Sequence, residues 1–271
     1  MPRIIEIDDI SLPELSVYAS LTEAQLKKEQ NTFIAESVKV IDVALNSGLE
    51  PISFLMEERQ IDGIGKEILA RCPDVPVFTA KRQVLSSLTG FELTRGVLCA
   101  MRRPESRTLD SVLENAKRVA VLERLSDSVN VGAIFRSAAA LGIDAVLLFH
   151  NCCEPLNRRT VRVSMGSVFL VPWAFFPKSD YPLPSDAVSY LRQKGFVTAA
   201  LALKGDSIGI DNPILASSQK LALFFGAEGD GLSEDTINTC DYTVKIPMHN
   251  SVDSLNVAAA AAITFWQLNG K

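Results

Sequence analysis

Leu221-Ala-Leu-Phe-Phe-Gly-Ala-Glu-Gly-Asp-Gly-Leu232 joins an apolar run directly to a glycine-dense turn. The apolar run is typical of a strand that is buried on both faces of a parallel sheet. Gly226, Gly229 and Gly231 lie within six residues around Glu228. Because ligands of open α/β sheets bind outside the carboxyl ends of the strands, the turn is predicted to meet a ligand. A tight turn carrying a solvated acid is the alternative that this segment alone leaves open.

The glycine turn does not match the common nucleotide-binding motifs. The G-x-G-x-x-G fingerprint of dinucleotide-binding domains is absent, and no Gly-Lys-Ser/Thr follows as in a phosphate-binding loop. The turn is therefore neither a dinucleotide fingerprint nor a phosphate-binding loop.

A second motif lies upstream, in Asp127-Ser-Val-Asn-Val-Gly-Ala-Ile-Phe-Arg136. A helix is predicted over residues 131–141 and ends at Gly142. Asn130 is suited to capping this helix. Arg136 lies on it among small and apolar neighbours, so it is either an ordinary surface arginine or a site residue.

A third motif lies downstream, in Ile246-Pro-Met-His-Asn-Ser-Val-Asp-Ser-Leu-Asn-Val257 and the alanine run that follows. A strand is predicted to end at Pro247, and Ser254 is predicted to cap the next helix. That helix is apolar nearly all round, so it is buried or packed against another subunit. Asn256 in its first turn either satisfies backbone groups or faces a site.

Strands alternate with helices along the chain, which indicates an α/β fold with a mostly parallel, doubly wound sheet. In the second half, strands are predicted at residues 119–123, 144–149, 168–171, 196–203, 221–225 and 242–248. In the first third, helices are predicted over 22–36, 37–47 and 64–70, and strands over 51–56, 75–79 and 96–101. Arg102-Arg-Pro-Glu-Ser-Arg107 is charged and breaks the pattern. The predicted division is a domain over 1–104, a linker over 105–111 and a domain over 112–271.

The composition is that of an ordinary globular protein, with 47% apolar and 22% charged residues in a chain of 271. Five cysteines without CxxC spacing suggest neither a disulfide framework nor a zinc site, and no metal is expected. The amino-terminal segment is too acidic for a signal peptide. No apolar run reaches the roughly 18 residues of a membrane span. We therefore expect a cytoplasmic protein with reduced thiols and no membrane partner.

The net charge of −5 argues mildly against a nucleic-acid partner, yet a local basic patch is sufficient for one. Phosphate contacts are predicted from one cluster in the second half, from the linker and from the first domain; solvated faces are the alternative. The residues are Arg158, Arg159 and Arg162, then Arg102, Arg103 and Arg107, then Lys81, Arg82 and Arg95.

Taken in order, the three motifs closely resemble the SpoU/TrmH branch of the SPOUT methyltransferases. The matching pieces are Asn130–Arg136, Phe225–Leu232, Ile246-Pro-Met248 and Ser254-Leu-Asn-Val257. The resemblance covers about residues 115–271. Phe33-Ile-Ala-Glu36 and Thr94-Arg-Gly-Val-Leu98 match more loosely the family's small α/β substrate-binding domain, which has a ribosomal-protein-like fold.

The resemblance implies transfer of a methyl group from S-adenosylmethionine to a ribose 2′-hydroxyl of structured RNA. It also implies a trefoil-knotted catalytic domain, an exception to unknotted topology, and a homodimer with the site near the subunit interface. By position, the catalytic set would be Asn130, Arg136, Glu228, Ser254 and Asn256. The cofactor contacts would be Gly226, Glu228, Ile246, Met248 and Leu255.

Two departures from the family pattern concern the backbone. Ser37 and Asn250 stand where many relatives have glycine. Asparagine is the next-best residue for a left-handed backbone. Neither position belongs to the catalytic set.

Several alternatives remain at this level. A catalytically inactive RNA-binding module of the same fold is one, and a Rossmann-like methyltransferase or dehydrogenase acting on a small molecule is another. A structural role through the alanine-rich helix would leave the other motifs unexplained. The separate amino-terminal domain favours rRNA over tRNA as the substrate.

Overall fold

The chain folds into two units, each with its own sheet. The computed structural model describes residues 3–7, 9–19, 26–27, 30–90, 96–204, 206–250 and 253–269. The first unit comprises Met1–Glu105 and Leu156–Phe169, and the second comprises Ser106–Pro155 and Leu170–Lys271. The break after Glu105 lies within the predicted linker. The segment Leu156–Phe169 groups with the first unit, although a contiguous second domain over 112–271 was predicted.

The first unit contains a mixed five-stranded sheet in the order β1-β4-β3-β5-β2. Its strands are β1 (Ile4–Glu6), β2 (Thr32–Glu36), β3 (Pro51–Glu57), β4 (Val77–Ala80) and β5 (Val97–Arg102). β4 runs parallel to β1 and β3, whereas β5 runs antiparallel to β3 and β2. Its helical segments are η1 (Pro13–Tyr18), α2 (Val38–Asn46), α3 (Glu58–Ile61), α4 (Lys66–Arg71), α5 (Arg82–Thr89), α8 (Arg158–Val163) and η2 (Ser167–Phe169).

The helix predicted over 22–36 is wrong at its carboxyl end. Thr32–Glu36 forms β2, all five of its residues are buried, and it pairs with β5. A β-branched and aromatic run of this kind fits a pleated, covered surface better than a helix. Of the remaining stretch, residues 22–25 and 28–29 lie outside the described residues, and residues 26, 27 and 30 are helical.

The strand predicted over 168–171 is also wrong. Positive φ angles at Met165 and Gly166 turn the chain, and the amide of Phe169 then donates to the Gly166 carbonyl. This closes the tight turn η2 in place of a strand. The strand follows later, as β8 (Trp173–Phe175).

Positive φ angles explain both backbone departures. Asn250 has a φ of 57°, the left-handed conformation expected there. Ser37 has φ 87° and ψ 146°, a region that glycine alone visits readily. Ser37 also precedes α2, where its hydroxyl accepts the Val40 amide at 3.4 Å, so the strained residue doubles as a weak helix cap.

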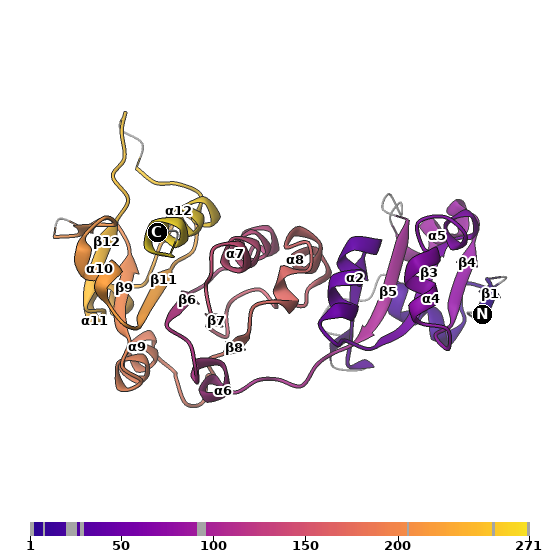
Figure 1. The fold of residues 1–271 in the computed structure, drawn as a ribbon, viewed down its shortest axis with the longest axis horizontal. Helices are drawn as coiled ribbons and strands as arrows, with labels where there is room; N and C mark the ends of the chain where they lie inside the picture. The colour runs from indigo at the N-terminus through magenta and orange to yellow at the C-terminus, as the bar shows by residue number, and fades with distance from the viewer. Residues whose placement is uncertain are drawn as a thin grey trace. The chain divides into compact units, whose positions relative to one another are not determined.

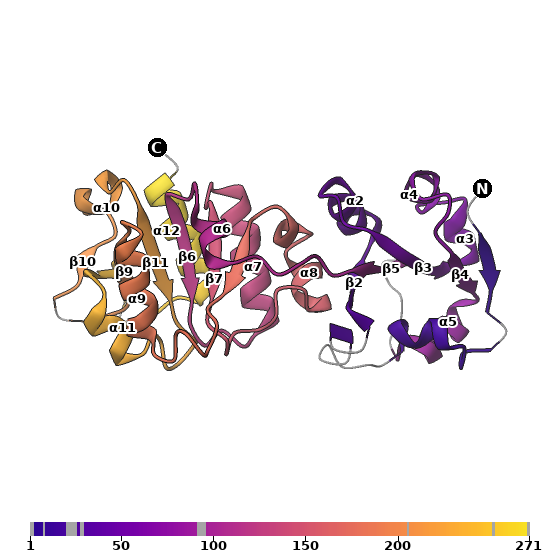
Figure 2. The same ribbon diagram turned by 90° about the horizontal axis from the view of Figure 1, so that it is seen from below.

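The second unit contains a seven-stranded, fully parallel sheet in the order β10-β12-β9-β11-β6-β7-β8. Figure 2 shows β9, β11, β6 and β7 side by side in this order. The remaining strands are β6 (Arg118–Leu122), β7 (Ala145–Leu148), β9 (Val197–Leu201), β10 (Ile208–Gly209), β11 (Leu221–Phe225) and β12 (Tyr242–Lys245). Its helices are α6 (Leu109–Leu113), α7 (Ser128–Ala140), α9 (Pro184–Gln193), α10 (Pro213–Ser217), α11 (Glu234–Thr239) and α12 (Val257–Asn269).

Helices cover both faces of this sheet (Figure 1). α6 and α9 pack on the face that carries Val119, Val121 and Phe224, and these residues share one core. α7 and α12 pack together on the opposite face, where the rings of Phe225 and Phe265 meet edge to face. Alternate residues of β11 thus point to opposite cores, as the continuous apolar run predicted. Among the described helices, none combines the length and the apolarity that crossing a bilayer requires.

Candidate active site

A cavity of about 600 Å³ lies at the carboxyl ends of β9, β11 and β12. Its walls come from the segments that follow these three strands, namely residues 201–204, 225–232 and 244–248, together with 253–257 before α12. Open parallel sheets bind their ligands at the carboxyl ends of the strands. The volume is in the range of small-molecule and cofactor sites.

The glycine turn after β11 forms one wall and leaves no room for a side chain at its base. A Cβ built on Gly226 would lie 2.2 Å from the carbonyl carbon of Gly231 and from the amide nitrogen of Leu232. The Gly231 amide donates to the Ala227 carbonyl at 3.0 Å, which closes the turn. The closed turn presents Glu228 on the cavity wall.

Asn256 ties this turn to two helices. Its side-chain oxygen accepts the amides of Ala258 at 3.0 Å and Ala259 at 3.3 Å, so it caps α12. Its Nδ2 donates to Asn130 Oδ1 at 2.9 Å and also to Glu228 Oε1. The same amide thus satisfies backbone groups of α12 and joins Asn130 to Glu228, two other members of the predicted catalytic set.

The caps of α12 and α7 differ from the predicted ones. Ser254 was expected to cap the last helix, but Asn256 does so, and α12 begins at Val257. Ser254 instead lies on the cavity wall. The cap predicted at Asn130 is also wrong: α7 begins at Ser128, and Asp127 caps it by accepting the Val129 amide at 2.8 Å. Asn130 is only 5% exposed and lies in the first turn of α7.

Within the described residues, hydrogen bonds join Asn130, Glu228 and Asn256, and Ser254 lines the same cavity, whereas Arg136 does neither. It lies six residues after Asn130 on α7, so at 3.6 residues per turn the two side chains are separated by about 120° around the helix axis. Its side chain is exposed, and it makes no hydrogen bond or ion pair with the residues that the structure describes. Its guanidinium is therefore available to a partner from outside this chain.

All the predicted cofactor contacts line the cavity: Gly226, Glu228, Ile246, Met248 and Leu255. The charged residues of the wall are the carboxylates Glu228, Asp230, Glu234 and Asp253 and the ammonium groups Lys204 and Lys245. Lys204 is already paired with Glu234 at 2.8 Å. The excess of carboxylates, together with apolar and backbone wall groups, fits a ligand with an apolar part and a positive charge.

Cys152 and Cys240 do not line the cavity and are not equipped as nucleophiles. Burial raises the pKa of the Cys152 thiol to about 11 and that of Cys240 to about 12. Both groups stay protonated at neutral pH, and the thiol form is the unreactive one. Chemistry at the cavity therefore depends on the polar groups of its walls.

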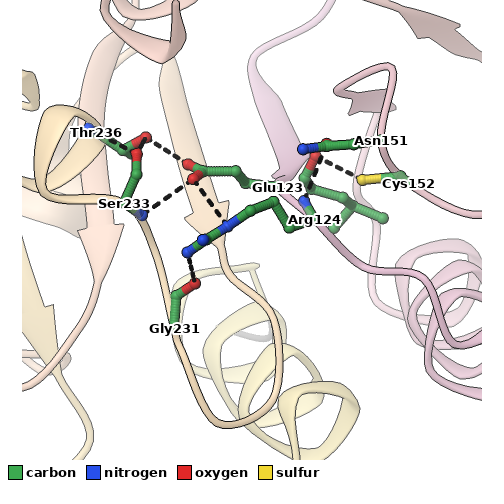
Figure 3. A network of polar contacts seen from close by, with 8 residues as sticks. Glu123, Arg124, Asn151, Cys152, Gly231, Ser233 and Thr236 are labelled. Carbon is green, nitrogen blue, oxygen red and sulfur yellow. Dashed lines mark hydrogen bonds and ion pairs between the residues drawn. The ribbon is translucent and has the colours of Figure 1, made fainter.

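Two residues beside the cavity, Glu123 and Arg124, were not anticipated as site residues. Figure 3 shows the buried carboxylate of Glu123 between Arg124 and the start of α11. Arg124 donates to the Gly231 carbonyl at 2.9 Å. The feature of the sequence that could have pointed to them is a pair of opposite charges directly after the apolar strand β6.

The arginines predicted to bind RNA have different surroundings. Arg158 and Arg162 lie 3.1 and 3.5 Å from Glu36, whose side chain is 4% exposed, so they neutralise a buried carboxylate. The prediction that Arg103 contacts RNA is wrong. Arg103 is 8% exposed and its Nε donates to the Thr32 carbonyl, so it does not lie on an RNA-binding surface. Arg159 is exposed on α8.

The remaining basic residues are more peripheral. Arg102 is 63% exposed and lies 3.0 Å from Glu50. Arg82 lies 3.9 Å from Glu57, and Lys81 is exposed. Arg95 lies outside the described residues. Arg107 and Lys81 are exposed, as is Arg159, whereas Arg102 is exposed but paired with Glu50.

Comparison with known proteins places these features among RNA-modifying enzymes. The model of the SpoU rRNA Methylase family matches residues 117–266. An uncharacterized tRNA/rRNA methyltransferase of Mycobacterium tuberculosis is 39% identical, over 86% of this chain and 79% of its own length. The 23S rRNA (guanosine(2553)-2′-O)-methyltransferase RlmP of Bacillus subtilis is 28% identical, over 90% of this chain and 92% of its own.

Solved structures share the fold. An AdoMet-bound rRNA methyltransferase from Sinorhizobium meliloti superposes with a TM-score of 0.81 at 24% identity, over 98% of this chain and 97% of the other. The SpoU methyltransferase AviRb from Streptomyces viridochromogenes, in complex with AdoMet, superposes with a TM-score of 0.77 at 22% identity, over 95% and 96%. At these identities the likeness describes the fold.

Proposed function

Because the chain belongs to the SpoU rRNA methylase family, we propose that it transfers a methyl group from S-adenosylmethionine to a ribose 2′-hydroxyl of structured RNA. One observation carries the proposal. Asn256 joins Asn130 and Glu228 at the cavity outside the carboxyl ends of three parallel strands. Residues from three distant motifs thus meet beside one cavity.

The cavity fits the cofactor in size and charge. Gly226, Ile246 and Leu255 would contact it mostly through the backbone, with Met248 and Glu228 in the same walls. The surplus of carboxylates suits a sulfonium cation. When bound, S-adenosylmethionine supplies an electrophilic methyl group, so the protein has to align and activate the accepting hydroxyl. Alignment alone contributes about 7–11 kcal/mol in favourable cases.

Arg136 is assigned to the RNA. A guanidinium stays protonated at neutral pH and presents a planar fork of donors to phosphate and hydroxyl oxygens. We assign Arg136 to orienting the ribose hydroxyl and an adjacent phosphate and to stabilising negative charge as it develops. Asn256 holds Glu228 and Asn130 in place on the cavity side.

We favour rRNA over tRNA as the substrate. RlmP, which is similar over nearly its whole length, carries the name of a 23S rRNA 2′-O-methyltransferase. The RlmB protein of Bordetella pertussis, 30% identical over 58% of this chain, is likewise named as a 23S rRNA methyltransferase. A separate amino-terminal unit with its own sheet provides a second surface for RNA.

The RNA surface is tested most cleanly at Arg159. Replacing it with glutamine should reduce the slope of log K against log salt concentration by about one, because one phosphate contact is lost. Thermal stability should not change, since Arg159 is exposed. Fluorescence anisotropy with an rRNA fragment at several salt concentrations measures this, and an unchanged slope removes Arg159 from the surface.

Arg158→Gln is the matched control on the same helix. It deprives the buried Glu36 carboxylate of a partner, so we expect a loss of about 1–3 kcal/mol in the free energy of unfolding. Any change in RNA affinity from Arg158→Gln would then reflect unfolding as well as charge.

We also propose a homodimer through the α7–α12 face. Ile263 is 42% exposed and Trp266 61% exposed, and with Ala259 they form one stripe along the outer side of α12. An exposed apolar stripe marks an association surface. Sedimentation velocity at micromolar concentration should give a dimer; a monomer at all concentrations would contradict the proposal.

The trefoil knot and a cytoplasmic location complete the proposal. β11 lies between β6 and β9, and the chain after β12 returns to pack α12 against α7. Free thiols at all five cysteines suit a reducing compartment. A chain trace from an experimental map tests the knot, and cell fractionation tests the location.

The activity is tested with radiolabelled S-adenosylmethionine and total rRNA or tRNA from a strain that lacks the gene. Label recovered as a 2′-O-methylated nucleoside in one pool would establish the reaction and the RNA class together. Measurable cofactor binding without label in either pool would favour the inactive RNA-binding module.

A further inference from the structure

Glu123 is a buried carboxylate beside the cavity that the proposed chemistry does not use. It follows β6 directly, is 2% exposed, and does not line the cavity. Its Oε1 accepts the Ser233 amide at 3.0 Å and its Oε2 accepts the Thr236 hydroxyl. A carboxylate at this depth is costly unless it is hydrogen-bonded and paired.

Arg124 supplies the neighbouring positive charge and makes a contact of its own. Its Nε lies 3.6 Å from the Glu123 carboxylate, and its Nη2 donates to the Gly231 carbonyl at 2.9 Å (Figure 3). The residue has a φ of 58°, an uncommon conformation for a side chain of this size. Its amide donates to Asn151 Oδ1 at 3.3 Å.

These contacts fasten the glycine turn at both of its ends. On the entering side, the Glu123 amide donates to the Phe225 carbonyl at 2.9 Å. On the leaving side, Arg124 holds Gly231 and Glu123 holds Ser233. Between these points lie Gly226, which has no free space, and Glu228, which faces the cavity.

We infer that Glu123 and Arg124 are positioning residues that hold the turn 226–231 in the geometry required for cofactor binding. The inference rests on the proposed function for the identity of the cofactor. Neither residue lines the cavity, so both act through Gly231, Ser233 and the turn that these residues close.

Arg124→Met tests the inference, because it removes the guanidinium while keeping an apolar stem. We expect the dissociation constant for S-adenosylmethionine, measured by calorimetry, to rise about tenfold, the usual cost of one charge-assisted hydrogen bond. Arg124→Lys keeps a donor and should recover part of the affinity. A constant within twofold of wild type for Arg124→Met would overturn the inference.

Arg118→Met is the matched control. Arg118 is the first residue of β6, the strand that leads to Arg124. It also donates to backbone carbonyls, those of Gln219 and Ala216, but at the amino ends of the strands. It should leave cofactor affinity unchanged even if stability falls. Equal weakening by both variants would mean that Arg124 is merely structural, which also overturns the inference.

Hydrogen exchange separates this inference from the proposed function. Without cofactor, the peptide over residues 225–237 should exchange faster in Arg124→Met than in Arg118→Met, because the turn has lost one anchor. If the wild-type protein binds no S-adenosylmethionine, the proposed function falls. Faster exchange would then still support the anchoring, and unchanged exchange would overturn it. Glu123→Gln should give the same pattern with lower stability, since it alters a buried group.

Discussion

Replacing Arg136 with alanine is expected to slow methyl transfer about 100- to 1000-fold, the usual effect of removing one preorganised donor from a developing charge. Cofactor affinity should stay within a few-fold of wild type, because Arg136 does not line the cavity. Stability should also hold, since its side chain is exposed and has no hydrogen-bond or ion-pair partner among the described residues. Single-turnover methyl transfer to RNA, with calorimetry for the cofactor, measures both effects.

Arg136→Lys is the informative companion variant. Lysine keeps the positive charge but loses the planar fork that fits a phosphate or a hydroxyl pair. An orienting role therefore predicts an intermediate rate, well below wild type and above alanine. Near-normal turnover of Arg136→Ala with intact cofactor binding would remove Arg136 from the catalytic set.

Most individual strands of the parallel sheet were predictable from local patterns. The apolar run Leu221–Phe225 is β11, with the same bounds as predicted, and the glycine turn follows at its carboxyl end. The left-handed backbone at Asn250 was likewise expected from the residue type. Such features depend on neighbours in the sequence, so one sequence is sufficient to predict them.

Contacts between distant segments were not predictable in the same way. The contacts of Glu123 and Arg124 with the glycine turn require β11 to lie next to β6, about 100 residues away in the chain. The hydrophobic periodicity of a strand does not predict which other strand it will pair with. The pairing of Arg158 with Glu36 joins residues 122 positions apart. Arg158 and Arg162, both predicted to contact phosphate, are instead partners of the buried Glu36 carboxylate.

The adjacency of Asn130, Glu228 and Asn256 lies between these two cases. Each residue stood out locally, as a polar group at a strand end or a helix start. Their meeting followed from the resemblance to a family, and the hydrogen bonds of Asn256 give it a physical basis. The role of Ser254 as a cap failed because the asparagine two residues later bonds the same turn.

Gly226→Ala should have the second large effect, on cofactor binding. The added Cβ would lie 2.2–2.3 Å from backbone atoms of Gly231 and Leu232, which cannot rotate away as a side chain would. The turn must open, and the wall that carries Glu228 moves with it. We expect the dissociation constant for S-adenosylmethionine to rise about 100-fold or more, together with a loss of about 1–3 kcal/mol in the free energy of unfolding.

Gly229→Ala separates the effect of the steric clash at Gly226 from the effect of replacing any glycine in the turn. A Cβ at Gly229 meets nothing within 4 Å, but the residue has a φ of 88°. Alanine there carries only the conformational cost, about 1–2 kcal/mol, and should weaken cofactor binding far less than Gly226→Ala. Calorimetric titration of both variants, with thermal unfolding alongside, makes the comparison. If the two variants bind the cofactor equally well, close packing at Gly226 does not shape the site, and the turn owes its geometry to the anchors at Arg124 and Glu123 alone.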